Sequence, residues 1–123
     1  MGLTLKARSI DSVVVFDLSG SLTVGEAVAQ MRETIQSHLH SGDRKFILNL
    51  ADVSYIDSSG LGALVWAYTS VRGKGGDVKL LNLTAKAKDL LQLTKLLTVF
   101  DSYGSESRAI GALTGWPKSA SSG

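Results

Sequence analysis

Residues 49–62 read Asn-Leu-Ala-Asp-Val-Ser-Tyr-Ile-Asp-Ser-Ser-Gly-Leu-Gly, and this stretch decides the fold class. The residues just before and at its start, 46–50, are almost all apolar, which is typical of a strand covered on both faces of a parallel sheet. Beyond it, residues 59–71 carry apolar side chains at offsets of three and four, the period of one helical face. The stretch therefore predicts a buried strand followed directly by an amphipathic helix.

Three polar residues stand at the expected junction between strand and helix. Asp57, Ser58 and Ser59 occupy positions where helix N-caps are found, because their side-chain oxygens accept hydrogen bonds from the first free amides. Local chemistry alone thus predicts a capped helix. Gly60 and Gly62 follow in the first turn, where each costs up to about 1 kcal/mol relative to alanine. We therefore expect a need for bare backbone there, such as the close approach of another chain.

Trp66 is the large aromatic residue of this helix. Its spacing from Leu61 turns it away from the apolar face, toward a strip of smaller residues: Gly62, Ala63, Thr69 and Ser70. An aromatic side chain beside such a strip is typical of a binding surface. Packing beneath a loop or a second helix is the alternative interpretation.

Strand patterns alternate with helix patterns along the whole chain. This alternation predicts an α/β fold with a mainly parallel sheet. A Thr-x-x-Glu capping box at Thr23 and Glu26 predicts the start of the first helix. The expected strands are 3–8 at an edge, 13–18, 46–50, 78–83 and a short one at 97–100; the expected helices are 24–40, 59–71, 85–94 and one that begins at Ser105.

Length and composition point to one domain. A chain of 123 residues with 44% hydrophobic content suits a single core that buries about two thirds of the unfolded surface. We expect this domain to span residues 1–114. Residues 115–123 are rich in Ser, Ala and Gly and lack material for a core, so we expect a disordered tail.

Charge and residue usage exclude several classes of function. Thirteen basic and eleven acidic residues give a net charge of +2, without the basic stripe that direct nucleic-acid binding needs. The absence of cysteine excludes disulfides and thiolate metal sites. No apolar stretch approaches the about 20 residues that span a bilayer, so we expect no membrane insertion and a cytoplasmic location. No residue pattern indicates a cofactor or a metal.

The sequence resembles the STAS-domain anti-sigma factor antagonists, which are small bacterial regulators of transcription. The resemblance rests on residues 46–62 with their Ile-Asp-Ser-Ser-Gly-Leu-Gly core, on 75–83 and on 90–100, and it spans about residues 3–112. It implies a single STAS-like domain whose successive βα units wind as one superhelix. In this family the serine after the aspartate is phosphorylated by a partner that is both serine kinase and anti-sigma factor, and a serine phosphatase removes the phosphate. That serine is Ser58.

The resemblance also implies a mechanism and roles for the neighbouring residues. Unphosphorylated protein is expected to bind the anti-sigma factor kinase and so free a sigma factor, and phosphorylation of Ser58 is expected to end binding. The protein would then be a regulator and not an enzyme. We expect Asp57 and Ser59 to cap and orient the switch, Gly60 and Gly62 to permit close contact, and Trp66 to line the docking face.

One departure from the family leaves an alternative open. Family members commonly read Gly-Glu-Leu-Asp after the second strand, with an aspartate used in partner recognition or phosphorylation, whereas this chain has Gly20-Ser21-Leu22-Thr23. Loss of that acidic residue is compatible with a STAS adaptor that is never phosphorylated and works within a signalling or lipid-transport complex.

Two further alternatives use the same neighbourhood. A receiver domain would accept phosphate on Asp57 with Mg²⁺, but the acidic pair and late lysine of receivers are out of place here. A serine hydrolase would need a base beside Ser58 or Ser59. The histidines are His38 and His40, which lie two apart and so on different helical faces, and the chain has no Gly-x-Ser-x-Gly elbow.

Overall fold

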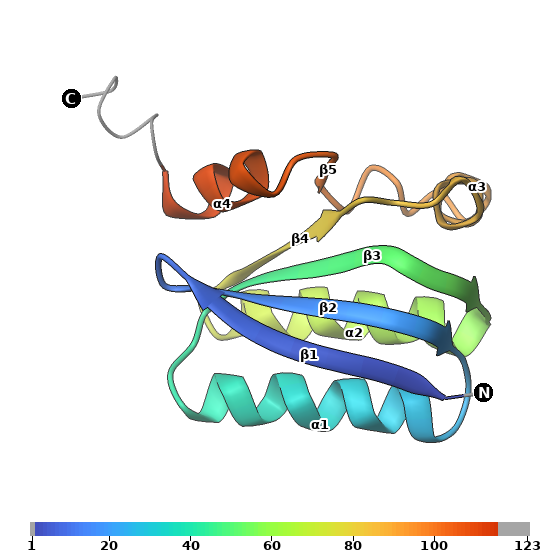
Figure 1. The fold of residues 1–123 in the computed structure, drawn as a ribbon, viewed down its shortest axis with the longest axis horizontal. Helices are drawn as coiled ribbons and strands as arrows, with labels where there is room; N and C mark the ends of the chain where they lie inside the picture. Colours follow the sequence, from blue (N-terminus) through green and yellow to red (C-terminus); the bar gives the residue numbers. More distant parts are fainter. Residues whose placement is uncertain (1, 116–123) are drawn as a thin grey trace.

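A computed structural model describes residues 2–115 of the chain. Within these residues, strands and helices alternate after an N-terminal hairpin (Figure 1). The strands are β1 Leu3–Ile10, β2 Val13–Leu22, β3 Lys45–Ile56, β4 Asp77–Leu81 and β5 Ser102–Tyr103; the helices are α1 Glu26–His40, α2 Ser58–Gly73, α3 Ala85–Leu93 and α4 Glu106–Thr114. The predicted domain limit at 114 coincides with the end of α4, and the tail expected at 115–123 lies outside the described residues after Gly115.

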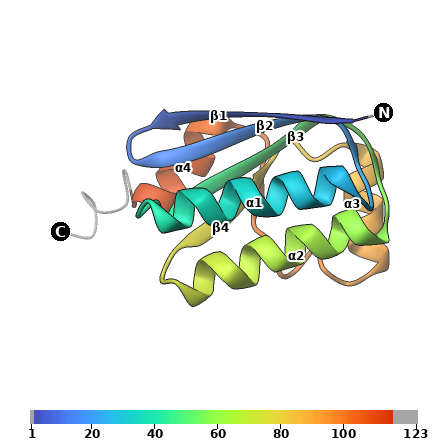
Figure 2. The same cartoon turned by 90° about the horizontal axis from the view of Figure 1, so that it is seen from below.

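The strands form one sheet in the order β1-β2-β3-β4-β5. β1 runs antiparallel to β2 at the edge, and every later neighbour is parallel. This arrangement confirms the predicted α/β fold with a mainly parallel sheet. Helices α1 and α2 lie side by side on one face, α4 covers the other, and α3 lies near the end of the sheet where β3 terminates (Figures 1 and 2). None of the helices formed within residues 2–115 has both the length and the apolar character that crossing a membrane requires.

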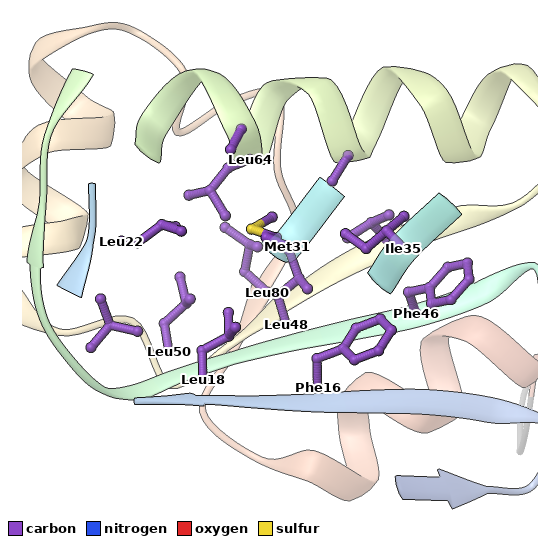
Figure 3. Packing of buried hydrophobic residues seen from close by; sticks show 14 of the residues in the cluster. Phe16, Leu18, Leu22, Met31, Ile35, Phe46, Leu48, Leu50, Leu64 and Leu80 are labelled. Carbon is purple, nitrogen blue, oxygen red and sulfur yellow. The ribbon is translucent and has the colours of Figure 1, made fainter. Parts of the chain in front are cut away.

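The main core fills the space between the sheet and helices α1 and α2. Phe16 and Phe46 come from neighbouring strands and stack with their ring centroids 5.7 Å apart. Met31 and Ile35 of α1 and Leu64 of α2 meet strand residues here, as Figure 3 shows. Each of these side chains is at most 1% exposed, and burial of this kind contributes about 1.5–3 kcal/mol per large apolar side chain.

A second, smaller core lies between the sheet and α4. It contains Val13, Val15, Ile47, Leu81 and Ala109. Successive residues of β2 and β3 therefore point into different cores, which explains why residues 13–16 and 46–48 are all buried. The unbroken apolar runs of the sequence reflect this cover on both faces.

An ion-pair network joins the first strand to the last helix. Arg8 donates hydrogen bonds to Asp17, at 2.6 and 3.1 Å, and to Glu106. Asn49 on β3 donates to the same Asp17 carboxylate at 2.8 Å. The Arg8 guanidinium holds the pKa values of Asp17 and Glu106 below their usual range, because it hydrogen-bonds both carboxylates. The network thus links the N-terminal hairpin to α4.

The predicted capping box of the first helix is wrong. α1 begins at Glu26, and its N-cap is Gly25, which forms no side-chain cap and has a φ of 107° that favours glycine. Thr23 lies before the cap, and Val24, the first residue of the expected helix 24–40, lies outside the helix and is 72% exposed. The chain therefore needs an extra turn between β2 and α1.

The short strand predicted at 97–100 is also wrong. Turns occupy this segment, and the last strand is β5 at Ser102–Tyr103. Phe100 is 3% exposed because its ring packs edge-on against Tyr68 of α2, with centroids 5.4 Å apart. The apolar character of the segment thus reflects packing against helices and not pairing in the sheet.

Candidate functional site

The predicted strand-to-helix junction is confirmed at residues 56–58. β3 ends at Ile56, Asp57 is the N-cap, and α2 begins at Ser58. Asp57 has an extended backbone, and its Oδ1 accepts a hydrogen bond from the Gly60 amide at 2.8 Å. This is the capping geometry that the residue types predict.

The other carboxylate oxygen of Asp57 makes a contact that the sequence did not reveal. Asp57 Oδ2 accepts a hydrogen bond from the backbone amide of Val24 at 3.0 Å. The Val24 and Gly60 amides, in that order of effect, lower the pKa of Asp57 because they hydrogen-bond its ionised form. Asp57 therefore joins the start of α2 to the β2–α1 loop, which comprises residues 23–25.

Ser58 and Ser59 lie in the first turn of α2. Ser58 is the first helical residue and is exposed, whereas Ser59 is half-buried. Free amides and the helix dipole favour negative charge at this end of a helix. An anion attached to Ser58 would thus lie beside a helix N-terminus and in contact with solvent.

Gly60 has an intramolecular reason to be glycine. It is buried, and a Cβ at this position would lie 2.0 Å from the Leu22 carbonyl oxygen of β2. The bare backbone expected for close contact with another chain at Gly60 instead lets α2 pack on β2. Gly62 differs, since it is exposed and a Cβ there would meet nothing within 4 Å.

Trp66 lies half-buried on the side of α2 that is next to α1. Its ring is half-buried against the main core, and the Arg32 guanidinium of α1 lies 5.3 Å from the ring centroid. Ala63, expected in the exposed strip, is fully buried. Gly62 and Thr69 of the expected strip are exposed, and a pocket of about 330 Å³ opens beside Trp66, Thr69 and Ser70. The docking role of Trp66 therefore stays a prediction.

Exposed apolar side chains flank the junction between β3 and α2. Val24 is 72% and Tyr55 is 55% exposed, and Tyr55 lies two residues before the Asp57 cap. The sequence pattern predicts neither exposed side chain, because Val24 falls within the expected helix 24–40 and Tyr55 lies outside the expected strands and helices. Next to Tyr55, a pocket of about 190 Å³ opens between β3 and the first turns of α3; its lining includes Val53, Ile56, Lys86, Ala87 and Leu90.

Comparison with known proteins identifies the family. The STAS domain model matches residues 4–109. The anti-sigma-B factor antagonist of Bacillus subtilis is 27% identical over 101 residues, which cover 82% of this chain and 91% of that protein.

Two solved structures share the fold. The Thermotoga maritima protein TM1081 superposes with a TM-score of 0.82 at 27% identity, over 89% of this chain and 94% of the other. The Bacillus cell fate determinant SpoIIAA, solved in its phosphorylated form, gives a TM-score of 0.70 at 25% identity, over 89% of this chain and 98% of the other. With a model match over most of its length, the chain belongs to the STAS domain family.

Proposed function

We propose that this chain is an anti-sigma factor antagonist that is controlled by phosphorylation of Ser58. In its unmodified form it binds an anti-sigma factor that is also a serine kinase, and the sigma factor held by that protein is released. Phosphorylated protein does not bind, and a serine phosphatase restores the active form. The chain acts as a regulator and not as an enzyme, and it works in the cytoplasm, where sigma factors act.

The observation that carries this proposal is the position of Ser58. It is exposed, it opens α2, and it follows a cap whose carboxylate is held by two backbone amides. A kinase can reach such a hydroxyl without unfolding the domain. The antagonist name of the Bacillus subtilis relative and the phosphorylated SpoIIAA structure support the same function.

Phosphorylation at this position changes charge and leaves the fold intact. The γ-phosphoryl group of a nucleoside triphosphate forms a bond to Ser58 Oγ, its bond to the leaving diphosphate breaks, and the hydroxyl proton passes to a base on the kinase. The product carries about 1.5 to 2 negative charges next to the positive end of α2, where the helix tolerates an anion. A partner surface that fits a neutral serine would then meet a bulky, solvated dianion.

The docking surface follows from the exposed residues at the junction. We define the switch surface as Val24, Tyr55, Ser58 and Gly62. Val24 and Tyr55 supply apolar area, and Gly62 offers exposed backbone beside Ser58. Aromatic and apolar side chains at the centre of an interface carry most of its binding free energy.

The other predicted site residues hold the switch surface in position. Asp57 caps the first turn of α2, in which Ser59 is half-buried. Gly60 lets that turn lie against Leu22, and the Trp66 ring contacts Arg32 of α1. Their contribution to binding is thus to hold the switch surface in place.

Mass spectrometry of the protein isolated from its host under growth and stress tests the modification. We expect phosphate on Ser58 in a fraction that changes with condition. A Ser58 peptide that stays unmodified, with phosphatases inhibited and full coverage, would contradict the switch and favour the unphosphorylated adaptor.

Two variants that introduce a negative charge test the effect of phosphorylation on partner binding. Ser58→Asp should abolish capture of the anti-sigma factor kinase, because it places a carboxylate on the switch surface. Ser107→Asp is the matched control, since Ser107 is exposed in the first turn of α4 on the other face of the sheet. Equal loss of binding in both variants would refute a specific role for Ser58.

A further inference from the structure

The β2–α1 loop, residues 23–25, is held to the switch by a long-range contact. Val24 donates its backbone N–H to Asp57 Oδ2 across 33 positions of sequence. The following residue, Gly25, caps α1 without a side-chain hydrogen bond. Backbone hydrogen bonds hold the two ends of the loop, from the Asp57 amide to the Leu22 carbonyl and from the Ala29 amide to the Gly25 carbonyl. The Asp57 carboxylate holds its middle residue, Val24.

The residue held by this hydrogen bond, Val24, has an exposed apolar side chain. Val24 is 72% exposed, and Leu22, at the end of β2, pairs in register with Ile56 at the end of β3. The loop thus presents Val24 next to the Tyr55–Ser58 segment. Movement of the loop would change the apolar part of the switch surface.

We propose that Asp57 is a positioning residue that couples the phosphorylation state of Ser58 to the position of Val24. With Ser58 unmodified, one carboxylate oxygen caps α2 at Gly60 and the other holds the Val24 amide. With Ser58 phosphorylated, the dianion on the next residue repels the Asp57 carboxylate and pushes it away from its present position between α2 and the loop. The Asp57–Val24 hydrogen bond then breaks and the loop is released.

The physical basis is like-charge repulsion at a shared helix end. A phosphate and a carboxylate on adjacent residues repel each other, and the more highly charged group gains more from the helix N-terminus. Glu26 adds a further acidic group in the first turn of α1 beside the loop. The Val24 amide is exposed, so water can replace the lost acceptor at little cost.

This inference rests on the proposed function only for the presence of phosphate on Ser58. Phosphorylation would then act twice on the switch surface, by adding charge at Ser58 and by displacing Val24. The consequence is a sharper loss of binding than a charge alone would give.

The test measures exchange of the Val24 amide with water by NMR in the full chain. Three ¹⁵N-labelled proteins are compared: unmodified, phosphoserine at position 58 and Asp57→Asn. Asparagine is an equally good N-cap but replaces one acceptor oxygen by a donor group, so it can keep the Gly60 bond and lose the Val24 bond. The Ala87 amide, which Thr84 caps at 3.1 Å, is the internal control in all three proteins, and the Gly60 amide is an additional control in Asp57→Asn.

We expect Val24 exchange to rise about fivefold in both the phosphoserine protein and Asp57→Asn, which corresponds to the loss of one hydrogen bond. Ala87 should be unchanged in both, and Gly60 should be unchanged in Asp57→Asn. Unaltered Val24 exchange in fully phosphorylated protein, or in Asp57→Asn, would overturn the coupling. No partner is present in this measurement, so unaltered Val24 exchange would leave the proposed function standing. Conversely, if phosphorylation of Ser58 did not affect partner binding, the coupling between Ser58 and Val24 would still stand.

Discussion

The Leu22 carbonyl oxygen lies where a side chain on Gly60 would have to begin. A Cβ on Gly60 would be 2.0 Å from this oxygen and 3.1 Å from Ile56 Cγ2. The same carbonyl accepts a hydrogen bond from the Asp57 amide at 3.4 Å. The end of β2 and the start of α2 are thus pressed together at the switch, and a glycine makes that contact possible.

Gly60→Ala should destabilise the domain, because the helix and strand must separate to admit the methyl group. We expect a loss of about 1–3 kcal/mol in the free energy of unfolding, the usual effect of overpacking. Gly62→Ala is the matched control in the same turn, where a Cβ meets nothing within 4 Å and helix propensity predicts a gain of up to about 1 kcal/mol. Urea unfolding measures both, and equal stability of the two variants would contradict the close packing.

Trp66→Ala should lower stability more than it lowers partner binding. The ring packs between α1 and α2 and carries the Arg32 guanidinium, so truncation removes core contacts and a cation–π interaction worth about 0.5–1 kcal/mol. Arg32→Ala should lose only the cation–π interaction and should therefore lower stability less than Trp66→Ala. Thermal unfolding and partner affinity are measured on the same variants. A large loss of affinity at an unchanged melting temperature would contradict this prediction and indicate that Trp66 contacts the partner.

Val24→Ser should weaken binding of the anti-sigma factor kinase at least about tenfold while leaving stability nearly unchanged. The side chain is 72% exposed, so it contributes little to the core, and interface anchors typically contribute more than about 1 kcal/mol. Leu93→Ser is the control, because Leu93 is 81% exposed on α3, outside the switch surface. Isothermal titration calorimetry would reject the proposed surface if Leu93→Ser weakened binding and Val24→Ser did not.

Acid should weaken the link between β1 and α4. The Arg8 hydrogen bonds lower the folded-state pKa values of Asp17 and Glu106 from 3.8 and 4.5, so both groups stabilise the fold above those unfolded values. That contribution is lost as pH falls through the lower folded-state values. Glu106→Gln should therefore be less stable than the native chain at neutral pH and lose less stability on acidification.

Urea unfolding at a series of pH values measures how the free energy of unfolding changes with pH in each protein. Glu33→Gln is the control, since Glu33 is an exposed residue of α1. The same pH dependence in the native chain and in Glu106→Gln would show that the ion pair does not contribute.

Features set by neighbouring residues could be predicted from the sequence. The change from an apolar run to a helical period locates the end of β3 and the start of α2, and the Asp57 cap follows from residue type three positions before Gly60. The caps of α3 and α4 at Thr84 and Ser105 are local in the same way. The family resemblance rests on these local patterns too.

Features set by contacts between distant segments could not be predicted. The Asp57–Val24 bond and the Gly60–Leu22 contact both depend on how β2 and β3 align. A helical wheel gives the direction of Trp66 but not the contact of its ring with the Arg32 guanidinium of α1. Likewise, Phe100 looks like a strand residue until its packing against Tyr68 is known.

The most direct test of the central claim is the affinity of the anti-sigma factor kinase for the full chain with Ser58 either unmodified or fully phosphorylated. We expect tight binding of the unmodified chain and at least about a hundredfold weaker binding of the phosphorylated chain, which corresponds to about 2.7 kcal/mol. Circular dichroism spectra should be the same for both forms. Equal affinity of the two forms would contradict a switch at Ser58.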